Sequence, residues 1–89
     1  MTAPAKLELF HAIADRASAR VRRYVDEHEL LGAMRYRNIF YPEVLADLIA
    51  RGGGEQTVPA LWDGERLFTG AEAIIARLKA HADVGRAGQ

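Results

Sequence analysis

Apolar residues follow strand-like spacing in four short segments of the chain. Residues 6–11 are almost continuously apolar, which is typical of a strand buried on both faces. Residues 34–39 alternate apolar and polar side chains, as a half-exposed strand at a sheet edge does. Residues 58–62 and 66–68 flank the Asp-Gly pair at 63–64, a turn signal that predicts a hairpin.

Three other segments follow helical spacing. Apolar side chains recur three and four residues apart over residues 16–28, and Asp15 stands where an N-cap belongs. A second helix begins at Pro42, because proline is favoured in the first helical turn, and ends at the glycines 52–54. The third is expected over residues 70–82.

The resulting order is β-α-β-α-β-β-α. It predicts an α/β domain with a four-stranded mixed sheet flanked by three helices, whose first two strands are parallel. A chain of 89 residues has room for one core. We expect an N-terminal tail over 1–5, a domain over 6–82 and a C-terminal tail over 83–89.

Charge narrows the choice of partners. The chain has 12 basic and 12 acidic residues, so its formal net charge is zero, which argues against a dedicated binder of nucleic acid or of anionic membranes. Arginines nevertheless gather in one stretch, as a solvated helix face or as a partner-binding patch. They are Arg16, Arg20, Arg22, Arg23, Arg35 and Arg37.

The absence of cysteine removes several kinds of chemistry. No disulfide and no cysteine-ligated metal can form, and the three histidines are too far apart in sequence to suggest a metal site. No apolar run has the length of a signal peptide or of a membrane span. We therefore expect a cytoplasmic protein that holds no metal.

The segment from Thr57-Val58-Pro59 through the hairpin to Ile74, together with the element order, resembles one branch of the thioredoxin superfamily. This branch contains the glutaredoxins and the N-terminal half of glutathione transferases. The residues Ser18-Ala19-Arg20-Val21-Arg22 are similar to the start of the first helix in both families. The resemblance covers residues 6–82 and implies a thioredoxin-like fold.

The resemblance places the family's redox pair at Asp15 and Ser18, at the start of the first helix. Without cysteine, thiol–disulfide exchange is excluded, because it needs an attacking thiolate. Two interpretations of these residues stay open. They are capping residues of the usual types, or Ser18 is a catalytic candidate that stabilises the thiolate of bound glutathione, as a serine does in some transferases.

The resemblance also implies a cis bond before Pro59, which frees the main chain of Val58 to pair with an extended peptide or with glutathione. An ordinary trans proline at a sheet edge is the alternative. Glu72 and nearby N–H groups would hold the glutamyl end of glutathione, unless Thr69 and Glu72 form a capping box. The implied ligand-binding set is Asp15, Ser18, Thr57, Val58, Pro59, Gly70, Ala71 and Glu72.

Three further features are candidates for function. His11, at the end of the first strand, is an acid/base or a satisfied polar residue, and Trp62 is expected to pack against the sheet. Aromatic side chains follow the second strand, where they could form a partner surface: Tyr36, Phe40 and Tyr41.

We expect a redox-inactive glutaredoxin-like domain that acts as a binding module for a protein partner or a small thiol peptide such as glutathione. The alternative is a transferase- or isomerase-type enzyme that uses the thiol of bound glutathione, with Ser18 assisting. Binding of nucleic acid through the arginines is a third hypothesis, which the zero net charge opposes. The oligomeric state stays open, a homo-oligomer included.

Overall fold

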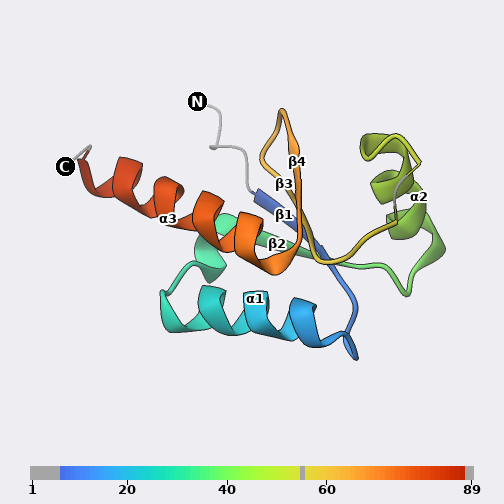
Figure 1. The fold of residues 1–89 in the computed structure, drawn as a ribbon, viewed down its shortest axis with the longest axis horizontal. Coiled ribbons are helices and arrows are strands. Elements are labelled where there is room, and N and C mark those ends of the chain that lie inside the picture. The colour runs from blue at the N-terminus through green and yellow to red at the C-terminus, as the bar shows by residue number, and fades with distance from the viewer. Residues whose placement is uncertain (1–6, 55, 88–89) are drawn as a thin grey trace.

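The computed structural model describes residues 7–54 and 56–87, with side chains described as far as His81. The observed order confirms the predicted one, with a 3-10 turn added after the first helix (Figure 1). The elements are β1 (Leu7–His11), α1 (Arg16–Glu27), η1 (Leu31–Ala33), β2 (Met34–Asn38), α2 (Pro42–Arg51), β3 (Ala60–Trp62), β4 (Leu67–Thr69) and α3 (Ala71–Ala87).

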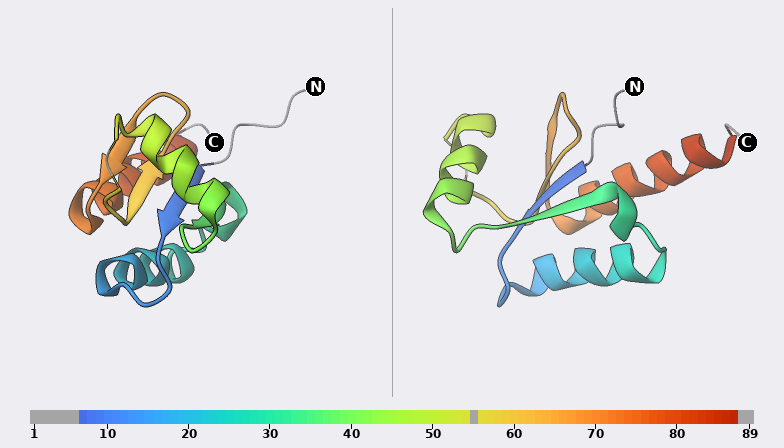
Figure 2. Two further views of the ribbon diagram at one scale, coloured as in Figure 1. Left: turned by 90° about the vertical axis from the view of Figure 1, so that its right-hand side faces the viewer. Right: turned by 180° about the vertical axis from the view of Figure 1, so that it is seen from behind.

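The four strands form one mixed sheet in the order β2-β1-β3-β4. β1 pairs in parallel with β2, as a helical crossover requires, and β2 lies at the edge, as its alternating pattern predicts. β3 pairs antiparallel with both β1 and β4. α1 and α3 lie against one face of the sheet and α2 against the other (Figures 1 and 2).

The central strand β1 supplies side chains to a hydrophobic core on each face. Leu7 and Leu9 point toward α1 and α3, whereas Phe10 points toward α2. The larger core consists of Leu7, Leu9, Val21, Val25, Met34, Leu61, Ala71, Ile74 and Leu78. The smaller one has Phe10, Leu48 and Ala60 as its buried members. The almost continuous apolar pattern of β1 follows from this burial on both faces.

An ion-pair network completes the attachment of α2 to the sheet. The Glu8 carboxylate on β1 accepts hydrogen bonds from Arg37 of β2 at 2.5 Å and from Arg51 of α2 at 2.6 Å. Arg37 also donates to Asp47 of α2 at 2.7 Å. The network therefore joins two neighbouring strands to the middle and the C-terminal end of α2.

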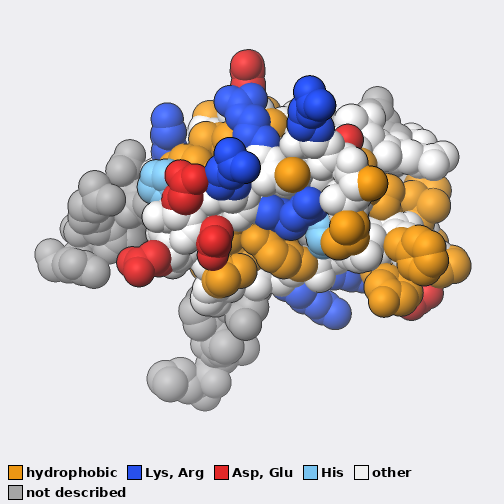
Figure 3. All heavy atoms as spheres, turned by 90° about the horizontal axis from the view of Figure 1, so that it is seen from below, with side chains coloured by type: hydrophobic (Ala, Val, Ile, Leu, Met, Phe, Trp, Pro, Cys, Tyr) orange, Lys and Arg blue, Asp and Glu red, His pale blue; other side chains and the backbone are white. Residues whose placement is uncertain are grey.

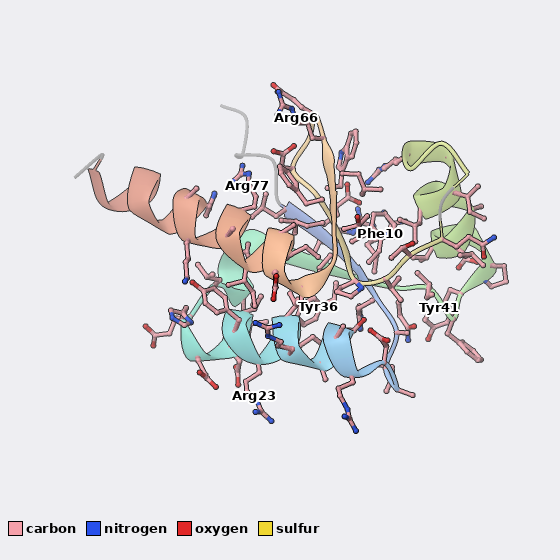
Figure 4. All side chains as sticks on the ribbon, in the orientation of Figure 1. Phe10, Arg23, Tyr36, Tyr41, Arg66 and Arg77 are labelled. Carbon is pink, nitrogen blue, oxygen red and sulfur yellow. The ribbon has the colours of Figure 1, made fainter. Side chains whose placement is uncertain are left out.

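Aromatic rings lie beneath the same guanidinium groups. The Arg51 group is centred 5.6 Å from the Phe10 ring and 5.1 Å from the Trp62 ring, and Arg37 is 5.3 Å from Phe10. These distances are those of cation–π contacts. In Figure 4, Phe10 lies between the strands and α2. Trp62 thus packs against the sheet, as predicted.

The hairpin and the last helix differ from the prediction. Four residues, not an Asp-Gly pair alone, connect β3 and β4, because Asp63 Oδ1 accepts the N–H groups of Glu65 at 2.9 Å and Arg66 at 2.8 Å and so closes a wider loop. The helix expected over residues 70–82 runs from Ala71 to Ala87 and so extends into the expected C-terminal tail over 83–89. Its single glycine, Gly85, costs only about 1 kcal/mol relative to alanine and does not stop the helix.

Some expectations fall on other parts of the chain. The predicted tail over 1–5, the strand residue Lys6 and the last two residues lie outside the described residues. Within residues 7–54 and 56–87, no helix combines the length and the apolar character needed to cross a membrane.

Replacement of Glu8 tests the ion-pair network. Burial alone would raise the pKa of Glu8, but the hydrogen bonds from Arg51 and Arg37 outweigh it and lower this pKa below its usual value. We expect Glu8→Gln to reduce the free energy of unfolding by about 1–3 kcal/mol at neutral pH, since Arg51 loses its ion pair and Arg37 keeps only Asp47 as an anionic partner. Denaturant titration monitored by circular dichroism measures the change.

The pH dependence gives a second readout. Because the pKa of Glu8 is depressed in the folded state, its stabilisation is present above the pKa of the unfolded chain, about 4.3, and is lost as the pH falls through the lower folded value. The difference between wild type and Glu8→Gln should therefore shrink in acid. Glu27→Gln, at an exposed position on α1, is the control. An equal loss in the control would contradict the assignment.

Candidate functional site

The loop between β1 and α1 is closed by the two residues that the resemblance singles out. The Asp15 carboxylate accepts the backbone N–H of Ser18 at 2.7 Å, which confirms it as the N-cap of α1. The Ser18 hydroxyl oxygen accepts the backbone N–H of Ala12 at 3.2 Å, and Ser18 is fully buried. The Ser18 hydroxyl therefore holds the loop onto the helix and presents no surface to a ligand.

Arg22 holds the same loop from the next turn of α1. Its Nη1 donates to the carbonyl oxygen of Ala12 and its Nη2 to that of Ile13, each at 3.1 Å. The same Nη1 lies 2.9 Å from Nδ1 of His11, at the end of β1. The sequence did not reveal this role, because Arg22 stands among five other arginines of similar spacing.

His11 is a satisfied polar residue in this arrangement. It is 4% exposed, and its ring centroid lies 5.2 Å from that of Tyr36 on β2. Burial and, second, the positive charge of Arg22 lower the pKa of His11. The neutral ring accepts from Arg22 at Nδ1 and carries its proton on Nε2. Burial likewise raises the pKa of the Tyr36 phenol, ahead of the opposing effect of Arg22.

The second part of the expected site lies where β3 begins. The peptide bond between Val58 and Pro59 is cis in the structure. The Pro59 carbonyl oxygen accepts the N–H of Gly70 at 3.0 Å, so the start of β3 and the start of α3 are bonded to each other. Pro59 is buried and Val58 half-buried, whereas Thr57 is exposed.

The start of α3 differs from the predicted capping box. Thr69 is the last residue of β4, where it pairs with Ala60, and Gly70 takes the N-cap position with φ at +89°. Its carbonyl oxygen accepts the N–H of Ile74 at 3.1 Å. Thr69 is therefore not the cap, because strand pairing holds it. No hydrogen bond among the described residues joins its side chain to Glu72, which is exposed.

Strand register brings the β1–α1 loop, the start of β3 and the start of α3 together at the edge of the sheet where β1 ends. β1 ends next to the start of β3, where Phe10 pairs with Ala60, and Ala60 also pairs with Thr69 at the end of β4. The β1–α1 loop, Val58-Pro59 and the turn into α3 therefore lie at the same edge. Ser18, Pro59 and Ala71 are buried there, so these three residues offer almost no accessible surface to a ligand.

A groove lies on the other side of the end of β1, beside β2. It has a volume of about 410 Å³ and is lined by Ala12, Ile13, Ala14, Asn38, Ile39 and Phe40. Ile13 is 65% exposed and Phe40 81%, and the neighbouring ring of Tyr41 meets Phe40 edge-on at 5.8 Å. Phe40 and Tyr41 are thus exposed together beyond β2, where the sequence suggested a partner surface.

Five of the six clustered arginines serve three different purposes. Arg22 holds the β1–α1 loop and Arg37 belongs to the network under α2. Arg16, Arg20 and Arg23 line the outer face of α1 and form no ion pair with any described residue. In Figure 4, Arg23 points away from the sheet, whereas Arg66 and Arg77 lie on the opposite side of the molecule.

Comparisons with known proteins provide no relative. No protein-family model, curated protein or solved structure matches the chain. Within the described ranges, no group of three or more histidine, aspartate or glutamate side chains is arranged to hold a metal ion.

Replacement of Ser18 separates a structural role from a catalytic one. We expect Ser18→Ala to lower the free energy of unfolding by about 1–3 kcal/mol, because the Ala12 N–H loses its acceptor beside a buried position. Denaturant titration measures the loss. Ala19→Ser, on the exposed side of the same turn, is the control. Full stability of Ser18→Ala would contradict the role assigned to the hydroxyl.

His11 should make stability depend on pH near neutrality. Its pKa is lower in the folded state, so the unfolded chain binds the proton first as the pH falls below about 6.5. We expect stability to decline from there with a slope of up to about 1.4 kcal/mol per pH unit. His11→Gln should flatten this decline, while His81→Gln should keep it. Thermal unfolding at a series of pH values measures this pH dependence for the wild type and both variants.

Proposed function

We propose that this chain is a redox-inactive glutaredoxin-like domain with a thioredoxin-like fold, and that it works as a binding module. The observed order of elements and the mixed sheet are compatible with that fold. The proposed site is the sheet edge where the β1–α1 loop, Val58-Pro59 and the turn into α3 meet. Its ligand would be a small thiol peptide of the glutathione type or an extended protein segment.

The observation that carries the proposal is the state of Asp15. In the family pattern, this position at the start of the first helix holds the nucleophilic cysteine. Here its carboxylate is engaged by the Ser18 N–H, and no cysteine occurs anywhere in the chain. A carboxylate cannot attack a disulfide as a thiolate does. The scaffold is compatible with binding and lacks the group for exchange chemistry.

Main-chain atoms support binding at this edge. β3 begins only at Ala60, so the half-buried Val58 takes no part in strand pairing and could bond to an extended ligand. Gly70, with no side chain, leaves the first turn of α3 open, where N–H groups attract a carboxylate. Glu72 and Thr57 are exposed beside these groups.

The geometry does not favour the enzyme alternative. A transferase of this type needs a hydroxyl that reaches the thiolate of bound glutathione. The Ser18 hydroxyl is fully buried and already bonded to Ala12. Among the described residues, His11 also lies out of reach, since it is buried against Arg22 and Tyr36. We therefore propose binding without catalysis.

A titration of ¹⁵N-labelled protein with reduced glutathione tests the proposal. Amide shifts should be confined to the neighbourhood of Ser18, Val58 and Glu72. S-methylglutathione should bind equally well, because recognition would come from the main chain and not from the thiol. Shifts that scatter over the surface, or none at millimolar ligand, would refute binding at this edge.

Asp15 gives a matched pair of variants. Asp15→Asn retains the cap but removes the negative charge, so an anionic ligand should bind about two- to fivefold more tightly. Glu27→Gln, at the other end of α1, should leave the affinity unchanged. Equal effects of the two variants would assign the change to overall charge and not to the site.

A further inference from the structure

We infer that a second surface, on the β2 side of the end of β1, docks an acidic segment of another protein that carries a large apolar anchor. This docking surface consists of the groove between Ile13 and Phe40 and the outer face of α1 with Arg16, Arg20 and Arg23. The docking surface lies beside the proposed ligand-binding edge, and the loop at residues 12–15 borders both. The two surfaces have no side chain in common. The inference stands whether or not glutathione binds.

The groove provides a place for the anchor. Its volume of about 410 Å³ falls within the range of roughly 300–1,000 Å³ that is typical of ligand pockets. Its walls are almost entirely apolar, with Asn38 as the one amide. Phe40 is 81% exposed, which leaves most of a phenyl ring in water. Burial of such a ring against a partner is favourable, and aromatic side chains dominate binding energy at protein interfaces.

The arginines provide the charge complement. Arg16 follows the groove residue Ala14 by two positions, and Arg20 and Arg23 continue along the same face of α1. Seven residues of helix place Arg16 and Arg23 about 10 Å apart, a span that a short acidic segment can match. Seen from the α1 side, apolar side chains gather at one end of the molecule, and basic side chains lie over the remainder together with acidic and further apolar ones (Figure 3).

Charge also decides between occupants. A second copy of this chain would bring the same three arginines into the contact, where like charges oppose association. Nucleic acid would meet Asp26 and Glu27 at the far end of the same helix and Glu29 just beyond it, in a chain with no net charge. An acidic segment with one apolar anchor satisfies both the groove and the helix face.

Peptide selection tests the docking surface. The full chain is used to select from a random library of twelve-residue peptides, and the affinities of the selected peptides are measured by fluorescence anisotropy. We expect enrichment of aspartate and glutamate together with tryptophan, phenylalanine or leucine. Phe40→Ser should raise the Kd by about tenfold or more. Arg20→Glu should raise it about fivefold, and this effect should diminish at high salt.

Two variants serve as matched controls. Leu31→Ser removes another exposed apolar side chain, 53% exposed on η1, and Arg66→Glu reverses an exposed arginine on the hairpin. Both should leave peptide affinity unchanged, and circular dichroism confirms that all variants fold.

Other results would overturn the inference. These are selected peptides without an acidic excess, no selected binder, or equal weakening by the controls. A dimer in sedimentation velocity that Phe40→Ser dissociates would assign the groove to a second copy. Tighter, steeply salt-dependent binding of a DNA duplex through the α1 arginines would assign the helix face to nucleic acid.

Discussion

The two-sided burial of β1 is the constraint on which the rest of the structure depends. Its alternate residues enter different cores, so α1 and α3 must lie on one face and α2 on the other. Its neighbours are parallel on one side and antiparallel on the other, and this register sets which segments meet at its carboxyl end. The proposed ligand-binding edge and the docking surface both lie at that end because four connections converge there: β1–α1, β2–α2, α2–β3 and β4–α3.

The loop that leaves β1 is held by polar contacts from α1. The Ser18 hydroxyl, the Arg22 guanidinium and the Asp15 carboxylate each bond to main-chain groups in or next to this loop. The side chains at this helix start therefore fix the backbone of the loop. These contacts are consistent with the proposed binding role, and the chain has no thiol for exchange chemistry.

Periodicity predicted most of the fold, because burial on one or two faces leaves a clear pattern in β1, β2 and α1. Periodicity and local motifs failed where the same sequence pattern is compatible with more than one structure. Thr69 and Glu72 match a capping box, yet strand pairing with Ala60 holds Thr69. In the sequence, Arg22 and Arg37 cannot be told apart from Arg20. Only the tertiary contacts show that Arg22 anchors a loop, that Arg37 forms a half-buried ion pair and that Arg20 is solvated. The Asp15 cap was predictable because it is local, whereas the burial of Ser18 required the packed structure.

The two layers of the domain differ in how firmly they are attached. α2 contributes a single fully buried side chain, Leu48, and relies on the carboxylates of Glu8 and Asp47 for much of its contact with the sheet. α1 has three buried residues, of which Val21 and Val25 belong to the larger apolar core. Regions with few buried apolar contacts open locally at the lowest free-energy cost, so we expect α2 to separate from the sheet first. Its release would expose Phe10 and Trp62 while β1 stayed paired, giving the domain a partly open state distinct from global unfolding.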